Sequence, residues 1–137
     1  MLAGSAVAVS ACGSTAAGVT TPRAPAPVNL TVYIDNSRVS VSPINVGAGP
    51  VAFIITNQAS QAESLSILHA GASGQPLADT GPINPQGTSQ VTVNFSSPGT
   101  YSLATGGGDP GSSGRIRAAQ IHIGAKRSSS DNQLLQP

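Results

Sequence analysis

Residues 50–57 are PVAFIITN, a nearly unbroken apolar run that begins at a proline and ends at an asparagine. A short continuous apolar run of this kind predicts a central strand that lies between two layers. Other segments alternate apolar and polar residues with a period of two, which is typical of half-buried strands. This alternation predicts further strands over residues 28–35, 39–42, 64–68, 90–95, 100–104 and 116–123.

Helical periodicity is weak along the whole chain, and glycine and proline interrupt it too often for long helices. Closely spaced strands with turn residues between them favour an all-β domain. We expect a two-sheet Greek-key sandwich or barrel of about seven or eight strands. A change in apolar alternation between Ala118 and Ile121 predicts a β-bulge in the last strand. Residues 71–87 are rich in glycine and proline, and we expect them to be irregular and to cap one end of the sandwich.

Composition argues against several classes of function. Charged residues make up 8% of the chain and the formal net charge is +1, which provides no electrostatic basis for binding nucleic acid. Trp is absent, and Phe and Tyr occur twice each, which is too few aromatic residues for a typical carbohydrate-binding face or a platform for stacked bases. The basic residues near the carboxyl end are interpreted as protection of a strand edge: Arg115, Arg117, Lys126 and Arg127.

The single cysteine of the chain, Cys12, ends the sequence VSAC at residues 9–12. This tetrad resembles a bacterial lipobox, in which the export machinery cleaves before the cysteine and a lipid is attached to its sulfur. Residues 1–11 are interpreted as a signal-peptide-like segment, truncated if the natural start lies upstream, because no Lys or Arg precedes Arg23. The resemblance implies an exported protein, anchored through lipid on Cys12 to the outer face of the bacterial cell membrane. The alternative is an ordinary buried thiol in an intracellular domain.

The rest of the chain divides by composition into a tether, one domain and a tail. Residues 12–27 carry the lipid-attachment cysteine and a Pro/Ala/Thr-rich stretch that cannot bury enough apolar surface to fold, and they are interpreted as a semi-rigid tether. Residues 28–124 have the size of one compact domain. Residues 125–137 are polar, and we expect them to be a disordered tail.

Two segments resemble the cupredoxin family of blue copper proteins. The first is FIITN at residues 53–57, followed by ESLSI at residues 63–67. The second runs from NPQG at residues 84–87, through VTVNF at residues 91–95, to PGTYSL at residues 98–103. The resemblance extends over about residues 28–124 and implies a cupredoxin-like sandwich.

The same resemblance implies that the copper ligands of the family are missing. It places the first copper-binding histidine at Glu63 and the copper-binding cysteine at Ala104. The loop that follows, residues 105–114, is TGGGDPGSSG and contains neither His nor Met. A type 1 copper site needs two imidazoles and a thiolate, so we expect no such site.

Substitute metal ligands are the alternative to this expectation. The chain has two histidines, His69 and His122, and it has carboxylates at Glu63 and Asp109 near the expected loops. Two imidazoles with a carboxylate suit Cu(II) or Zn(II), provided that the side chains converge in the folded domain. His122 stands between two isoleucines of a predicted strand, and we therefore expect it to face solvent.

No catalytic motif is recognisable in the sequence, so we expect neither enzyme activity nor a cofactor. Glu63 is the sole glutamate, and a pair of catalytic carboxylates would have to combine it with an aspartate. Ser73 does not fit the G-x-S-x-G pattern of a nucleophile elbow, because residue 75 is Gln. The glycine-rich residues 106–111 lack the Lys-Ser/Thr pair of a phosphate-binding loop.

Three functions remain as hypotheses. The leading one is a membrane-anchored lipoprotein whose extracytoplasmic domain binds an envelope protein or a small ligand through residues 58–63, 71–87 and 105–114. The second is a metal-handling protein for copper or zinc, or an electron-transfer protein, with non-standard ligands. The third is an immunoglobulin-like structural domain of the envelope. Strand order distinguishes the third, because cupredoxin barrels mix parallel and antiparallel pairs.

Overall fold

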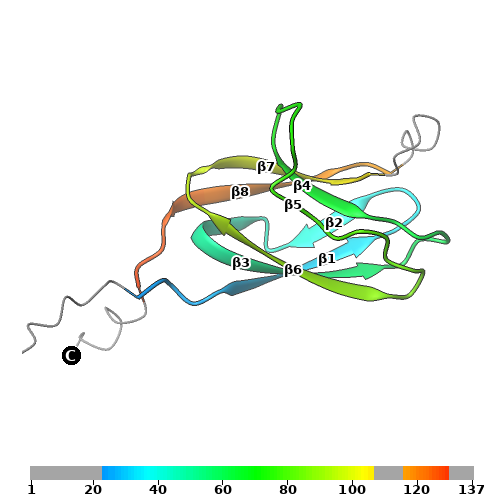
Figure 1. Cartoon of the computed structure of the whole chain (residues 1–137), viewed down its shortest axis with the longest axis horizontal. Helices are drawn as coiled ribbons and strands as arrows, with labels where there is room; N and C mark the ends of the chain where they lie inside the picture. The colour runs from blue at the N-terminus through cyan, green and yellow to red at the C-terminus, as the bar shows by residue number, and fades with distance from the viewer. Residues whose placement is uncertain (1–22, 107–115, 130–137) are drawn as a thin grey trace, which may run out of the picture.

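The computed structural model describes residues 23–106 and 116–129, and every regular element in these ranges is a strand (Figure 1). Cys12 and Asp109 lie outside the described residues, as do residues 130–137 of the expected tail. The eight strands are β1 Val28–Ile34, β2 Val39–Ser42, β3 Asn45–Asn57, β4 Leu65–His69, β5 Ala78–Asp79, β6 Thr88–Phe95, β7 Gly99–Thr105 and β8 Ala119–Lys126.

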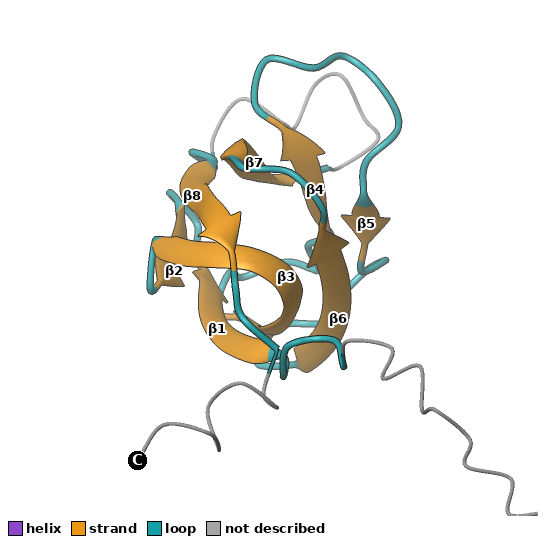
Figure 2. Cartoon of the chain, turned by 90° about the vertical axis from the view of Figure 1, so that its left-hand side faces the viewer, coloured by secondary structure: helices purple, strands orange, loops and turns teal. Residues whose placement is uncertain are grey.

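Strand β3 joins two sheets, because its two parts pair with different strands (Figure 2). Residues 49–57 lie between β1 and β6, and β2 extends this first sheet beyond β1. Residues 45–48 pair with β8, and the second sheet continues through β7 and β4 to β5. The β1–β3 and β3–β8 pairs are parallel and the other strand pairs are antiparallel. The predicted all-β fold of two sheets is confirmed, and its mixed strand directions differ from the antiparallel sheets of an immunoglobulin-like sandwich.

The two ends of the sandwich differ in what they carry (Figure 1). The first part of the described chain and residues 127–129 lie together at one end, which we call the terminal end and define by residues 23–27, 47–50, 95–97 and 126–127. At the opposite end, β1 and β3 finish and β4, β6 and β8 begin. We call this the loop end and define it by residues 35–38, 58–63, 105–106 and 116–117.

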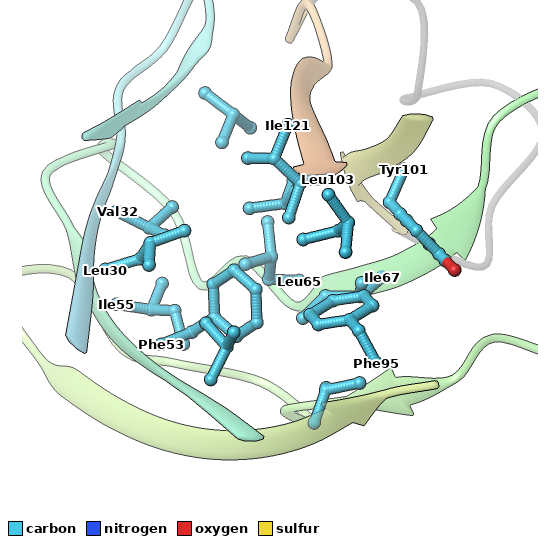
Figure 3. Close-up of a cluster of buried hydrophobic side chains, with 14 of the residues drawn as sticks. Leu30, Val32, Phe53, Ile55, Leu65, Ile67, Phe95, Tyr101, Leu103 and Ile121 are labelled. Carbon is cyan, nitrogen blue, oxygen red and sulfur yellow. The ribbon is translucent and has the colours of Figure 1, made fainter. Parts of the chain in front are cut away.

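The inward-facing residues of both sheets form one apolar core (Figure 3). Leu30, Val32 and Ile34 are fully buried, as the alternation over residues 28–35 predicts. Three aromatic rings connect the sheets: Phe95 of β6 packs edge-on against Phe53 of β3, with ring centroids 6.2 Å apart, and against Tyr101 of β7, at 4.6 Å. Edge-to-face packing of this kind adds to the stabilisation from burial.

The predicted bulge in the last strand is wrong in its position. β8 begins at Ala119, so Ala118 precedes the strand, and Ile121 and Ile123 are both buried in regular alternation. The register shift lies further on, where Gly47 pairs with Gly124 but Ala48 pairs with Lys126. Ala125 is therefore the extra residue. β8 also includes Ala125 and Lys126, which the composition assigned to the polar tail.

Residues 71–87 are not irregular throughout. They include β5, whose Ala78 pairs with Ile67 of β4, and a bridge between Ile83 and Glu63. Ile83 is buried in the core. The segment therefore runs along the edge of the second sheet and returns to the loop end, where β6 begins, instead of only capping the sandwich. Ile83 shows no apolar alternation with its sequence neighbours, so the sequence did not predict its pairing with Glu63.

Candidate functional site

The turn between β1 and β2 is built around the carboxylate of Asp35. Its Oδ1 atom accepts hydrogen bonds from the backbone N–H of Ser37 at 2.7 Å, the hydroxyl of Ser37 at 2.7 Å and the backbone N–H of Arg38 at 2.8 Å. The Ser37 hydroxyl and these backbone donors, with the nearby Arg38 guanidinium, hold the pKa of Asp35 below its ordinary value of 3.8. The turn is thus fixed by local contacts at neutral pH.

The loop after β3 is held by Asn57, which is fully buried. Its Nδ2 atom donates to the carbonyl oxygens of Gln61 at 2.7 Å and Ile83 at 2.8 Å, and its Oδ1 atom accepts from the N–H of Ala59 at 2.9 Å. A buried amide that makes all of these bonds specifies the path of the backbone around it. Residues 58–61 therefore have a conformation that these internal bonds define.

A second asparagine ties this loop to the β1–β2 turn. The Oδ1 atom of Asn36 accepts hydrogen bonds from the backbone N–H of Ser60 at 2.9 Å and from its hydroxyl at 3.0 Å. These contacts join two segments that are 24 residues apart in the chain. The turn and the loop therefore form one continuous surface.

Glu63 lies at the edge of this surface and is half-buried. Its backbone exchanges hydrogen bonds with Ile83, at 3.1 Å and 2.8 Å. The next residue, Ser64, accepts from the N–H of Gly106 at 3.2 Å and donates its hydroxyl to the carbonyl of Gly106 at 2.6 Å. The start of β4 is thereby joined to the end of β7.

Two arginines stand side by side at the loop end. Arg38 and Arg117 form a parallel bridge, in which the N–H of Val39 donates to the carbonyl of Arg117 at 2.8 Å and the N–H of Arg117 donates to Ser37 at 2.9 Å. Both side chains are exposed. Asp35 faces Arg38 at 3.8 Å, so this part of the surface combines both signs of charge.

The two histidines lie away from the loop end. His69 closes β4, where its ring packs edge-on against Tyr101 with centroids 5.0 Å apart. His122 lies on β8, and its Nδ1 atom is 3.1 Å from the hydroxyl oxygen of Thr100 on β7. His122 is exposed between buried neighbours, as the sequence predicts.

Known structures share this architecture at low sequence identity. Auracyanin A, a blue copper protein from the green thermophilic photosynthetic bacterium Chloroflexus aurantiacus, matches with a TM-score of 0.55 at 16% identity, over 72% of this chain and 99% of auracyanin A. Auracyanin B matches with a TM-score of 0.52 at 15% identity, over 76% of this chain and 94% of its own. The fold is cupredoxin-like.

A copper enzyme contains a similar domain as one part of a longer chain. The copper-containing nitrite reductase from Thermus scotoductus matches with a TM-score of 0.50 at 19% identity, over 80% of this chain but 30% of the reductase. No protein-family model matches the sequence, and no curated protein sequence matches it either. These likenesses establish the cupredoxin-like fold of the domain and not its chemistry.

The residues of this cupredoxin-like domain do not fit a type 1 copper centre. Glu63 occupies the position where the family resemblance implies the first histidine, and Ala104 occupies that of the cysteine. In the structure, Ala104 pairs with Ser66 and Thr105 pairs with Leu65, so the end of β7 lies beside the start of β4. The side chains at this junction include no thiolate or imidazole, which a type 1 copper centre needs.

The substitute ligands that lie within the described residues do not converge either. Glu63 precedes β4 and His69 ends it, so about 20 Å of extended chain separates them. His69 has the same strand parity as the buried Leu65 and Ile67, whereas His122 points outward from β8, so the two imidazoles lie on opposite faces of one sheet. Over residues 23–106 and 116–129, no three His, Cys, Asp or Glu side chains are grouped closely enough to hold a metal ion. Asp109 lies outside these ranges.

The structure adds little on membrane attachment. Cys12 and the residues before it are outside the described part of the chain. Within that part, no helix is long and apolar enough to cross a bilayer. Lipid attachment therefore stays a prediction from residues 9–12.

Sequence reasoning missed the residues that shape the two ends of the cupredoxin-like domain. Asn57 was recognised as the end of a strand, but its buried side-chain bonds were not expected. Arg127 was interpreted as an edge cation, whereas its guanidinium donates to backbone carbonyls at the terminal end. The position of Asn57 at the end of an apolar run could have indicated a buried amide. The sequence around Arg127 contains no pattern that indicates its acceptors.

Proposed function

We propose that this protein is a lipid-anchored, extracytoplasmic cupredoxin-like module that uses its loop end to bind another envelope protein or a small ligand, without copper and without catalysis. One observation carries the proposal: the loop end is an ordered surface on the side of the domain opposite the terminal end. The Asn57 and Asn36 bonds hold this surface in one conformation. A surface that is ordered in advance loses less entropy when a partner binds.

Anchoring on Cys12 would present this surface to partners. Residues 13–22 connect Cys12 to Arg23, and a proline-containing spacer of this length reaches up to about 35 Å when extended. The chain enters the domain at the terminal end. A lipid on Cys12 would therefore bring the terminal end toward the membrane and leave the loop end facing outward.

The chemistry of the loop end suits recognition better than catalysis. It combines the guanidinium groups of Arg38 and Arg117 with the carboxylates of Asp35 and Glu63, and its other exposed polar side chains are amides and hydroxyls. Arginine is well suited to paired hydrogen bonds with carboxylates on a partner. At this end the Ser37 hydroxyl donates to the carboxylate of Asp35, but the lowered pKa of Asp35 makes that carboxylate a poor general base, which supports a binding role.

Mass spectrometry of the membrane fraction tests the anchor. The full chain, expressed with its export signal in a bacterium that modifies lipoproteins, is expected to carry a diacylglycerol on Cys12 and to sediment with membranes. The Cys12→Ser variant is expected to lose the modification and to be released. Unmodified Cys12 in an exported chain would contradict the anchoring part of the proposal.

Photo-crosslinking tests the recognition surface with four exposed glutamines as matched positions. Gln58 and Gln61 lie at the loop end, and Gln90 and Gln120 lie on the sheets. A photoreactive residue is placed at each position in turn in the anchored chain. We expect one discrete adduct of the same mass from the two loop-end positions and none from the two sheet positions. Adducts from the sheet positions alone would contradict the proposed surface.

A further inference from the structure

The terminal end is organised by Arg127, just after β8. Its guanidinium donates from Nε to the carbonyl of Gly47 at 3.1 Å, from Nη1 to Ala26 at 2.6 Å, and from Nη2 to Pro50. Its backbone N–H donates to the carbonyl of Ala48 at 3.0 Å. One side chain therefore joins the carboxyl-terminal strand, the bend of β3 and the segment that enters β1.

Two glycines make room for this side chain. A Cβ atom on Gly47 would lie 2.6 Å from Cγ of Arg127, and one on Gly49 would lie 2.9 Å from Nη2. Gly49 also has a φ of 134°, which other residues rarely adopt. Neither glycine can be replaced without moving the Arg127 side chain, so the packing of the terminal end depends on the position of this guanidinium.

Three basic residues lie at the terminal end, where the chain enters the domain. Ala24, Pro25, Pro50 and Lys126 line one hollow of about 290 Å³ at this end. Arg23 lines the neighbouring hollow, with Ala26 and Pro50. Arg23 and Lys126 are exposed, and the bonds of Arg127 go to neutral carbonyls, which leave its charge in place. The terminal end thus carries three cations within a small area.

The carboxylates of the described residues lie toward the other end. Asp35 follows the end of β1, and Glu63 precedes β4. Asp79 is paired with Ser66 near the start of β4. The described part of the domain is therefore electrostatically asymmetric, because its acidic groups are near the loop end and the three cations at the terminal end have no acidic neighbour among the described residues.

We propose that the terminal end is an electrostatic docking surface for an anionic lipid bilayer, with Arg23, Lys126 and Arg127 facing the phosphate headgroups. Charge complementarity identifies this occupant, and the chain that leaves this end leads to Cys12. The inference rests on the proposed function for the anchor that brings the surface to the membrane. Basic residues near an anionic surface each strengthen binding about fivefold, and their attraction falls off within about 8 Å at physiological salt.

Vesicle sedimentation of the unlipidated full chain, carrying Cys12→Ser, tests this surface independently of the anchor. The vesicles are phosphatidylcholine alone, or an equal mixture of phosphatidylcholine and phosphatidylglycerol. We expect binding to the mixed vesicles at low ionic strength that weakens toward about 0.15 M salt. Binding to phosphatidylcholine alone measures any contribution of the apolar first residues, which does not depend on charge.

Two charge-reversed double variants decide where the contact lies. Arg23→Glu with Lys126→Glu is expected to weaken binding to the mixed vesicles on the order of 25-fold or more. Arg38→Glu with Arg117→Glu makes the same change of charge at the loop end and is expected to weaken it much less. Equal losses in both variants, or no binding of the parent chain to the mixed vesicles, would overturn the proposal. Absence of lipid on Cys12 would refute the anchor and leave this result unchanged.

Discussion

The side-chain amide of Asn57 donates to the carbonyl oxygen of Ile83 at 2.8 Å, across 26 residues of the chain. This bond joins the end of β3 to the segment that leads into β6, and the same amide also holds Gln61 in the intervening loop. The carbonyl of Ile83 also accepts from the N–H of Glu63, whereas the buried N–H of Ala59 depends on the Oδ1 atom of Asn57. The shape of the loop end therefore depends on one buried polar side chain.

Replacing this residue is expected to destabilise the domain strongly. The Asn57→Ala variant leaves the carbonyls of Gln61 and Ile83 and the N–H of Ala59 without their side-chain partner, and it leaves a small cavity. An unpaired buried polar group such as the N–H of Ala59 costs about 1–3 kcal/mol and the cavity adds to this, so we expect a loss of about 3 kcal/mol in the free energy of unfolding. Urea unfolding followed by circular dichroism measures it. A loss below about 1 kcal/mol would show that the loop re-forms without the amide.

Asn36→Ala is the matched control for Asn57→Ala, because Asn36 is also a loop-end asparagine but its hydrogen bonds are exposed. It removes the two hydrogen bonds to Ser60, which water can replace. We expect a loss of at most about 1 kcal/mol. The loop-end adducts expected from Gln58 and Gln61 should become weaker in this variant, because its loop is no longer tied to the β1–β2 turn.

The carboxylate of Asp35 makes stability depend on pH. Its pKa is lower in the folded protein than the ordinary value of 3.8, because the Ser37 hydroxyl and the N–H groups of Ser37 and Arg38 donate to it. The stabilisation is present above the unfolded pKa and is lost as the pH falls through the folded pKa. Urea unfolding from about pH 2 to pH 7 is expected to show a stability advantage over Asp35→Asn at neutral pH that disappears in acid. An advantage that stays constant across this range would refute the assignment.

Copper binding separates the proposed module from a metal-handling protein. His69 and His122 lie on opposite faces of one sheet, so Cu(II) is expected to bind weakly and without defined stoichiometry, and no intense blue absorption is expected. Calorimetric titration with visible spectra measures this, and His69→Ala and His122→Ala should each remove only a part of any weak binding. Saturable one-to-one binding that either substitution abolishes would contradict the proposal.

The parts of the fold that were predictable are those whose signal is local. The alternation over residues 28–35 predicted which side of β1 is buried, because each strand residue faces opposite to its neighbour. The extension of β3 back to Asn45 was missed, since residues 45–49 are NVGAG and two glycines in five residues weaken the signal of a strand. The resemblance of residues 53–103 to cupredoxins predicted the fold, and the structural neighbours confirm it.

The candidate sites were less predictable because they depend on contacts between distant segments. The placement of His69 and His122 on opposite faces of one sheet follows from the pairing of β4 and β8 with β7, and no spacing in the sequence encodes that pairing. The acceptors of Arg127 lie 77 to 101 residues earlier in the chain. The composition of the polar tail does not indicate that Arg127 makes these hydrogen bonds. Only the folded backbone brings those carbonyls to the arginine.

The glycines around Arg127 provide the last test, because β8 contains a matched control. Gly47→Ala would place a Cβ atom 2.6 Å from Cγ of Arg127 and 2.9 Å from the backbone oxygen of Ala125, so the side chain or the strand must move. We expect a loss of about 2 kcal/mol. Gly124, its partner in the ladder, has its closest neighbour for an added Cβ at 3.9 Å, and Gly124→Ala should be neutral or slightly stabilising. Urea unfolding compares the two variants. Equal stability of both variants would show that the Arg127 side chain can move without loss of stability, and that Arg127 does not organise the terminal end.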